Sequence, residues 1–242
     1  MREEYTIRPI AYVRSDYKEK FGIPKQCGLV TELEQAVILV PEFRNADALR
    51  KLDMFSHIWL IWGFSEISEG SDPGEWHPTV RPPRLGGKRV GVWASRSPYR
   101  PNALGLSSVR FERIELDGKP VSPDDLSGTV KGELAVIISG GDLMDGTPVF
   151  DIKPYMPYSD SHPEASNGYS QGKGDPDLRV VFPNDLLNMI DEEKRAGLMQ
   201  ILRLDPRDAY NKKDGYTYGL SFGKWNIRFT VTGEVLTVTN VE

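Results

Sequence analysis

Strand-like runs with almost no helix between them most constrain what this chain can form. Segments rich in β-branched and aromatic residues follow one another through the first two thirds, separated by Gly, Pro and Asp clusters. Of the intervening segments, Ala46–Leu52 alone has a short helical pattern, so parallel βαβ units are not expected. The sequence predicts a mainly β domain with an antiparallel sheet curled into a barrel. The runs cover residues 6–13, 36–40, 55–64, 89–94, 104–116 and 129–139.

The longest run predicts where the sheet bends. Within residues 104–116, Val109 and Phe111 share one phase of strand alternation, whereas Ile114 and Leu116 share the other. A change of phase requires one extra residue in the strand. We therefore expect a β-bulge near Glu112 or Arg113.

A polar segment separates a second, smaller unit from the first. Residues 158–177 are rich in Ser, Asp, Gly, Pro and Asn, which is typical of a linker or long loop. The expected organisation is a β-barrel domain over residues 1–158 and a small α+β domain over residues 175–242.

The second unit is expected to contain one helical region and a hairpin. Asn184 is a candidate N-cap for a helix whose apolar residues fall at helical spacing, with a candidate break at Gly197. Two later runs, residues 225–231 and 235–238, flank Thr232-Gly233-Glu234 and predict a β-hairpin.

Composition narrows the class of protein. The single cysteine, Cys27, excludes an internal disulfide, and a lone cysteine with three scattered histidines argues against a zinc site. No apolar run approaches the length that crosses a bilayer, and the start of the chain lacks the pattern of a secretory signal. A protein of the cytoplasm, with neither membrane nor metal as a partner, is expected.

Charge is distributed unevenly along the chain. The net charge of −5 argues against a protein that coats nucleic acid indiscriminately. Between residues 77 and 111, however, no acidic residue occurs. This stretch is either a basic face that pairs with acidic neighbours or a local anion-binding surface. Its basic residues are Arg81, Arg84, Lys88, Arg89, Arg96, Arg100 and Arg110, and the acids just before it are Glu66, Glu69, Asp72 and Glu75.

The common nucleotide-binding and nucleophile motifs are absent. The sequence contains neither a Gly-x-Gly-x-x-Gly segment after a strand nor a Gly-x-x-x-x-Gly-Lys-Ser/Thr loop. It also lacks Gly-x-Ser-x-Gly, and the surroundings of Cys27 match no nucleophilic cysteine family, so covalent catalysis has little support.

The segment from Gly91 to Ser107 alternates arginines with prolines between two strands. Pro98 and Pro101 stiffen the backbone and reduce the entropy lost when Arg96 and Arg100 are fixed. Guanidinium groups suit phosphate or carboxylate ligands. The alternative interpretation, a rigid strand connection with solvated arginines, stays open.

The segment from Gly140 to Tyr155 places two carboxylates in a glycine-rich loop after a strand. Glycines let a backbone approach a ligand closely, and Asp142 and Asp145 are positioned to meet one. The alternative is that each aspartate hydrogen-bonds its own backbone in a tight turn.

Taken together, these segments resemble the TsaA-like family of tRNA adenosine N6-methyltransferases, also called TrmO. The resemblance spans nearly the whole chain. The segments that match the family's motifs are Pro24-Lys25-Gln26, Arg81–Gly87, Arg96–Gly105, Asp142–Tyr155 and Asp205-Pro206-Arg207-Asp208-Ala209-Tyr210. The departures are Lys25 for Arg, Ala103 and Asp208 for Pro, and Ser65-Glu66 for His-Gln.

The resemblance implies a β-barrel methyltransferase that works as a homodimer and uses S-adenosylmethionine. Its implied substrate is N6-threonylcarbamoyladenosine, 3′ of the anticodon, so the anticodon stem-loop of tRNA is the expected partner. Carried over by position, the cofactor contacts are Pro24, Lys25, Gln26, Ser65, Glu66, Arg96, Leu106, Asp142, Leu143, Met144 and Asp145. The candidates for tRNA contact are Arg84, Arg100, Asn102, Asp205, Arg207 and Tyr210.

Methyl transfer from a sulfonium needs mainly in-line alignment, with no metal or covalent intermediate. Carboxylates near Asp142 would balance the sulfonium charge, while Arg96 would hold the methionine carboxylate. The target nitrogen must lose a proton, and Asp145 is the hypothesised base. Two alternatives remain: an RNA-binding barrel without catalysis, and a methyltransferase acting on another nucleoside or a small molecule.

Overall fold

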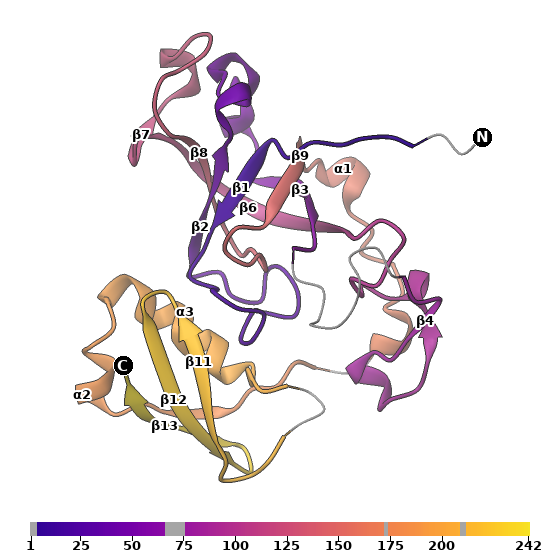
Figure 1. Ribbon diagram of the computed structural model, residues 1–242, viewed down its shortest axis with the longest axis vertical. Helices are drawn as coiled ribbons and strands as arrows, with labels where there is room; N and C mark the ends of the chain where they lie inside the picture. Colours follow the sequence, from indigo (N-terminus) through magenta and orange to yellow (C-terminus); the bar gives the residue numbers. More distant parts are fainter. Residues whose placement is uncertain (1–3, 66–75, 172–173, 209–211) are drawn as a thin grey trace.

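Strands and short turns make up the first two thirds of the chain, and a second sheet with helices follows (Figure 1). The structure, a computed structural model, describes residues 4–65, 76–171, 174–208 and 212–242. Within those ranges, seven strands form the first sheet. They are β1 (Ala11–Arg14), β2 (Glu34–Leu39), β3 (His57–Gly63), β6 (Leu104–Leu116), β7 (Lys119–Val121), β8 (Leu134–Ser139) and β9 (Pro148–Pro154).

The strand pairings of the first sheet are antiparallel. Its order is β3-β9-β1-β2-β8-β6-β7, and β6 also pairs with β3. Inward-facing side chains such as Leu60, Val109, Val136 and Val149 form its core. The expected mainly β, antiparallel architecture is confirmed, whereas closure of the sheet into a barrel stays a prediction.

The bulge expected in the longest strand is present. The register of β6 against β8 shifts between Phe111 and Arg113, which leaves Glu112 as the extra residue. Before the shift β6 pairs with β3, and after it β6 pairs with β7. The bulge therefore lies where the strand changes neighbours.

Two segments expected from the sequence differ from the structure. The helical stretch expected over residues 46–52 is a pair of 3-10 turns, η2 (Ala46–Leu49) and η3 (Leu52–Met54). Lys51 between them has a φ of 66°, and this left-handed conformation interrupts a continuous helix. The strand expected over residues 89–94 is a two-residue strand, β5 (Val90–Gly91), followed by a 3-10 turn, η5 (Val92–Ala94).

Short elements connect the strands of the first part. β5 pairs with β4 (Thr79–Val80) in a separate two-stranded sheet. The remaining turns and helices are η1 (Pro41–Phe43), η4 (Pro83–Leu85), η6 (Pro123–Asp125), α1 (Pro157–Asp160) and η7 (Gly168–Ser170).

The second sheet has the order β10-β13-β12-β11 and is covered by a helix. The expected hairpin is confirmed, since β12 and β13 pair antiparallel. The strand β10 pairs parallel to β13. The elements are β10 (Arg179–Val181), α2 (Asn184–Leu187), α3 (Glu192–Arg203), β11 (Thr217–Phe222), β12 (Trp225–Thr232) and β13 (Val235–Val241).

The helical region differs from the expected one in its start and in its break. Pro183 occupies the N-cap position of α2, and Asn184 is the first helical residue. Gly197 lies inside α3, where an added Cβ would come within 2.2 Å of Leu33. A close approach between segments, not a helix end, therefore accounts for this glycine.

The core of the second sheet includes residues from the start of the chain. Tyr17, Val30 and Leu33 pack with apolar residues of α3 and the second sheet, such as Leu198 and Phe229. Residues between Tyr17 and Leu33, which fall within the first predicted domain, thus contribute to the core of the second sheet. In the described part of the chain, no helix is long and apolar enough to span a bilayer.

Candidate functional site

A carboxylate held by two neighbouring strands is the centre of the candidate site. Asp142 follows β8, and its Oδ1 accepts a hydrogen bond of 2.7 Å from the hydroxyl of Ser107 on β6. The Ser107 hydroxyl in turn accepts a hydrogen bond of 3.0 Å from the indole N–H of Trp62 on β3. The three side chains form a chain of donors that fixes the position of the carboxylate.

Glycines allow the loop before Asp142 to pack tightly. Gly140 has a φ of 74°, and its carbonyl accepts a hydrogen bond of 2.7 Å from the backbone N–H of Gly28. A Cβ on Gly141 would lie 2.0 Å from the side-chain oxygen of Gln35 and would displace that side chain, which donates hydrogen bonds to the Ser15 hydroxyl and the Leu143 carbonyl. These contacts hold residues 26–28 beside the start of the loop.

Burial and hydrogen bonds oppose each other at Asp142. Burial raises the pKa of its carboxyl group, whereas the Ser107 hydroxyl, backbone N–H groups and the charge of Arg96 act to lower it. Burial also raises the pKa of the Cys27 thiol, and the negative charge of Asp142 adds to that effect. The net outcome is a carboxylate whose ionised form is disfavoured and would gain from a cation nearby.

Arg96 lies in the same cluster. Its guanidinium donates a hydrogen bond to the side-chain oxygen of Gln26 and acts electrostatically on Asp142. The proline-braced arginine segment and the glycine-rich loop, which are far apart in sequence, thus converge with residues 26–27.

Asp145 has different surroundings. Its carboxylate accepts hydrogen bonds of 2.9 Å from the backbone N–H of Ser15 and from the ammonium of Lys18. Burial acts to raise its pKa, but these two hydrogen bonds outweigh that effect, so the pKa lies below its usual range. Asp145 is therefore an ionised group that is engaged in holding residues 15–18.

The other predicted cofactor contacts differ in their exposure. The Leu143 side chain is buried in the core, so only the backbone of this residue is available to a ligand. Pro24 is also buried. Leu106 is 58% exposed, and Ser65 lies exposed just after β3. Met144 is half-buried and Lys25 is exposed, whereas Glu66 lies outside the described residues.

The predicted RNA contacts of the first part are partly used within the protein. Arg84 forms an ion pair with Asp175. The Arg100 guanidinium donates hydrogen bonds to the carbonyls of Val92 and Ser95, at 3.2 and 2.7 Å, and so braces η5. The Asn102 side chain is exposed.

The predicted RNA contacts of the second part occupy a buried position instead. Asp205 and Arg207 are 3% and 6% exposed and form a two-pronged ion pair with distances of 2.8 and 3.0 Å. Lys212 binds the same carboxylate at 2.6 Å. Asp205 and Arg207 thus bind each other inside the protein, and Tyr210 lies outside the described residues, so contact of this segment with RNA stays a prediction.

A pocket of about 290 Å³ separates these residues from the loop of residues 20–25. Lys25 lines it together with Asp205 and Arg207. Although Lys25 is exposed overall, the protein atoms around it disfavour its charged form, and together with the positive charge of Lys212 they lower its pKa. The loop of residues 20–29 thus has the Asp142 cluster on one side and this pocket on another.

Ser107 and Trp62 are site residues that sequence reasoning missed. Ser107 shares the inward phase of β6 with Val109, a position where an apolar residue is the norm. A polar residue in the inward phase of a strand was the available signal, since a buried hydroxyl needs a hydrogen-bond partner.

Comparisons with known proteins agree with these observations. The family model described as tRNA-methyltransferase O N-terminal domain matches residues 12–161, and the one described as TrmO C-terminal domain matches residues 175–242. The chain is 37% identical over 237 residues to the tRNA (adenine(37)-N6)-methyltransferase of Escherichia coli, covering 94% of each protein. It is also 37% identical over 225 residues to a putative S-adenosylmethionine-dependent methyltransferase, RcsF, of Pseudomonas aeruginosa, covering 89% of this chain and 88% of the relative. The crystal structure of TrmO from Pseudomonas aeruginosa superimposes with a TM-score of 0.72 at 29% identity, covering 99% of this chain and 100% of the other.

Proposed function

This chain belongs to the tRNA-methyltransferase O family, and from that premise we propose that it methylates N6 of N6-threonylcarbamoyladenosine, 3′ of the anticodon. It is an S-adenosylmethionine-dependent tRNA methyltransferase, as its relatives are named. The single observation that carries the proposal is the convergence of Arg96 and Asp142 in one cluster.

The cluster has the charges that a sulfonium donor requires. S-adenosylmethionine supplies the methyl group when bound, and it carries both a sulfonium and a carboxylate. Asp142 is a partly buried carboxylate that a nearby cation would stabilise, and Arg96 offers a guanidinium that suits a carboxylate. Gln26 keeps Arg96 in place through their shared hydrogen bond.

Two carboxylates are candidates for taking the proton from the target nitrogen. The role of Asp145 stays a prediction, and its hydrogen bonds with Lys18 and Ser15 weigh against it because they lower its pKa. A general base works best when its pKa is near the operating pH. We infer that Asp142 is the better proton acceptor, because Lys18 and the backbone N–H of Ser15 engage the Asp145 carboxylate, whereas Asp142 accepts its side-chain hydrogen bond from the neutral hydroxyl of Ser107.

The anticodon stem-loop is proposed to contact the basic stretch that includes Arg84, Arg100 and Asn102. Arg100 and Arg84 are partly engaged inside the protein, so a phosphate would share them with Ser95 and Asp175. Exposed loop nucleotides suit this mode of recognition, in which unpaired bases are accessible.

We further propose a homodimer that works in the cytoplasm. Leu104 and Leu106 are 37% and 58% exposed on β6, next to Ile61 on the paired strand β3. An exposed apolar strip on a sheet is a common mark of a protein interface. The pairing of β6 with β3 also supports the proposal that the first sheet closes into a barrel.

Mass spectrometry of tRNA nucleosides from cells lacking the protein tests the substrate. Loss of the methylated threonylcarbamoyl nucleoside, restored by the wild-type chain but not by the Asp142→Asn variant, is the expected result. Loss of a different methylated nucleoside would point to another substrate. Unchanged nucleosides, together with no heat on titration of S-adenosylmethionine into the purified protein, would favour a non-catalytic RNA-binding module.

A further inference from the structure

A basic lobe projects beside the two sheets. The lobe consists of residues 76–102 and contains β4, η4, β5 and η5. It holds six basic residues and no acidic one, in a chain whose net charge is −5. In Figure 1 the lobe, marked by the label β4, lies at the right-hand edge of the view. Such a local excess of positive charge attracts a polyanion even when the whole protein is acidic.

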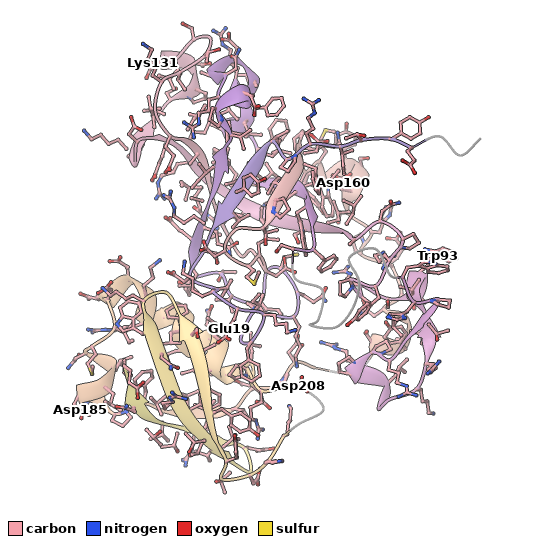
Figure 2. All side chains as sticks on the ribbon, viewed as in Figure 1. Glu19, Trp93, Lys131, Asp160, Asp185 and Asp208 are labelled. Atoms are coloured by element: carbon pink, nitrogen blue, oxygen red, sulfur yellow. The ribbon has the colours of Figure 1, made fainter. Side chains whose placement is uncertain are left out.

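Two tryptophans lie exposed on this lobe and stack on each other. Trp93 is 74% exposed and Trp76 is 43% exposed. Their ring centroids are 6.2 Å apart, with 21° between the planes. Figure 2 places Trp93 at the outer edge of the lobe. Large aromatic side chains contribute most of their binding energy when they are covered, so an exposed stacked pair on a charged surface suggests a ligand with a flat face.

The fold of the lobe holds Trp93 in a position where its side chain is exposed to solvent. The pairing of β4 with β5 and a hydrogen bond of 3.0 Å from the Val92 N–H to the Pro78 carbonyl hold residues 76–80 beside residues 90–93. Val92 is buried, with 1% exposure, and anchors the turn η5. Trp93 is therefore presented by a braced turn, which reduces the entropy lost when a ligand covers it.

We propose that Trp93, backed by Trp76, is a stacking platform for an unpaired base of the RNA. The proposal rests on the proposed function and adds to it the anchor for a neighbouring nucleotide. Basic groups combined with an exposed aromatic face are the arrangement by which proteins bind single-stranded RNA. Trp93 precedes Arg96 by three residues, so their Cα atoms are at most roughly 10 Å apart. The stacked base therefore belongs to the same loop as the methylated nucleotide.

A second copy of this chain is a less suitable occupant. Contact between two such lobes would bring like charges together, because each lobe holds six basic residues and no acidic one, and Asp175 compensates one of the six, Arg84. Like charges across an interface oppose association. The alternative is kept as an outcome of the test.

The test compares RNA affinity among four proteins with unchanged cofactor sites. Wild type, Trp93→Ala, Trp93→Phe and Tyr158→Ala are titrated with a fluorescent anticodon stem-loop and with a fully paired RNA of the same length. Tyr158→Ala is the matched control, because Tyr158 is 87% exposed and lies outside the lobe. Heat on binding S-adenosylmethionine verifies that each variant is folded.

Trp93→Ala is expected to weaken stem-loop binding by roughly 5- to 150-fold, as loss of one base stack does. Trp93→Phe should retain most of the affinity, and paired RNA should bind all four proteins alike. The slope of log affinity against log salt should stay unchanged in Trp93→Ala. A fifth protein, Lys88→Gln, should have a slope smaller in magnitude by about 0.7, because it loses one phosphate contact.

Two results would overturn the inference. Stem-loop binding by Trp93→Ala equal to that of wild type would show that no base stacks there. A change in oligomeric state on Trp93→Ala, measured by sedimentation, would assign the surface to a second copy. If wild type itself binds no stem-loop RNA, the proposed function fails, and this outcome differs from a wild type that binds and methylates tRNA with Trp93 dispensable.

Discussion

The hydroxyl of Ser107 donates a hydrogen bond of 2.7 Å to the carboxylate of Asp142, which lies 35 residues later in the chain. This contact joins β6 to the loop after β8. Its hydroxyl oxygen is itself held by the indole N–H of Trp62 on β3. Three segments of the first sheet thus fix one negative charge, and preorganised charge is what stabilises a developing cationic or anionic group during catalysis.

Removal of the Ser107 hydroxyl should weaken cofactor binding. Ser107→Ala leaves the Asp142 carboxylate with one hydrogen bond fewer, and hydrogen bonds to charged groups contribute about 1.5–3 kcal/mol. We expect roughly a ten- to hundredfold loss of S-adenosylmethionine affinity by calorimetry. Because the Ser107 hydroxyl lowers the pKa of Asp142, the acid limb of binding should also move to higher pH. Ser108→Ala on the same strand is the control, and equal losses in both variants would contradict the assignment.

Replacement of the Asp142 carboxylate by a neutral amide should abolish methyl transfer but stabilise the fold at neutral pH. Its folded pKa is raised by burial, so its ionisation opposes folding. That penalty is absent below the unfolded pKa of about 3.9 and is complete above the raised folded pKa. Asp142→Asn lacks this penalty at every pH. The melting temperature of Asp142→Asn minus that of wild type should therefore increase as the pH rises across this window, while methyl transfer is lost. A variant less stable than wild type at pH 8 would refute the expectation.

Local patterns predicted the strands and the bulge, because the alternation of apolar and polar side chains in a strand depends only on residues close together in the sequence. The run Leu104–Leu116 and the extra residue near Glu112 could be read in this way. By contrast, the break at Lys51 depends on a single left-handed residue, which alternation does not encode.

The candidate site was predictable only in part, for a similar reason. Motifs predicted Arg96 and Asp142 as site residues, and the structure places both near Gln26 and Cys27. Burial of Arg207 was not predictable, because it depends on Tyr218, whose ring lies 5.9 Å from the guanidinium and comes from a later strand. A sequence motif alone does not predict which of its charged side chains will be buried by residues from elsewhere in the chain.

Asp145→Asn tests the two candidate bases against each other. Loss of a general base lowers turnover by about 10²–10⁴-fold. Since Asp145 is paired with Lys18 and has a lowered pKa, we expect Asp145→Asn to reduce kcat by much less than Asp142→Asn does. Single-turnover methylation measured under saturating cofactor gives both values. A greater loss of kcat in Asp145→Asn would restore Asp145 as the base.

Gly105 should not tolerate a side chain. An added Cβ would lie 2.2 Å from the ring of Trp62, the residue whose indole holds Ser107. Gly105→Ala should displace that ring, destabilise the protein by about 1–3 kcal/mol and weaken cofactor binding. Gly91→Ala, which meets no atom within 4 Å, is the matched control. Urea unfolding and calorimetry report the two effects, and identical behaviour of the two variants would argue against the packing described.

The buried pair of Asp205 and Arg207 is expected to contribute to the stability of the fold more than to RNA binding. Loss of one partner leaves the other charge buried without compensation, which typically costs about 3–5 kcal/mol. Asp205→Ala should therefore lower the urea midpoint strongly, whereas Arg203→Ala, which breaks an exposed pair with Asp177, should change it little. Hydrogen bonds from Arg207 and Lys212 outweigh burial and lower the pKa of Asp205, so its contribution is present above an unfolded pKa of about 3.9. As the pH falls through the lower folded pKa, wild type should lose this advantage over Asp205→Ala. An Asp205→Ala variant that unfolds like wild type at pH 7 but binds tRNA poorly would instead assign the pair to RNA recognition.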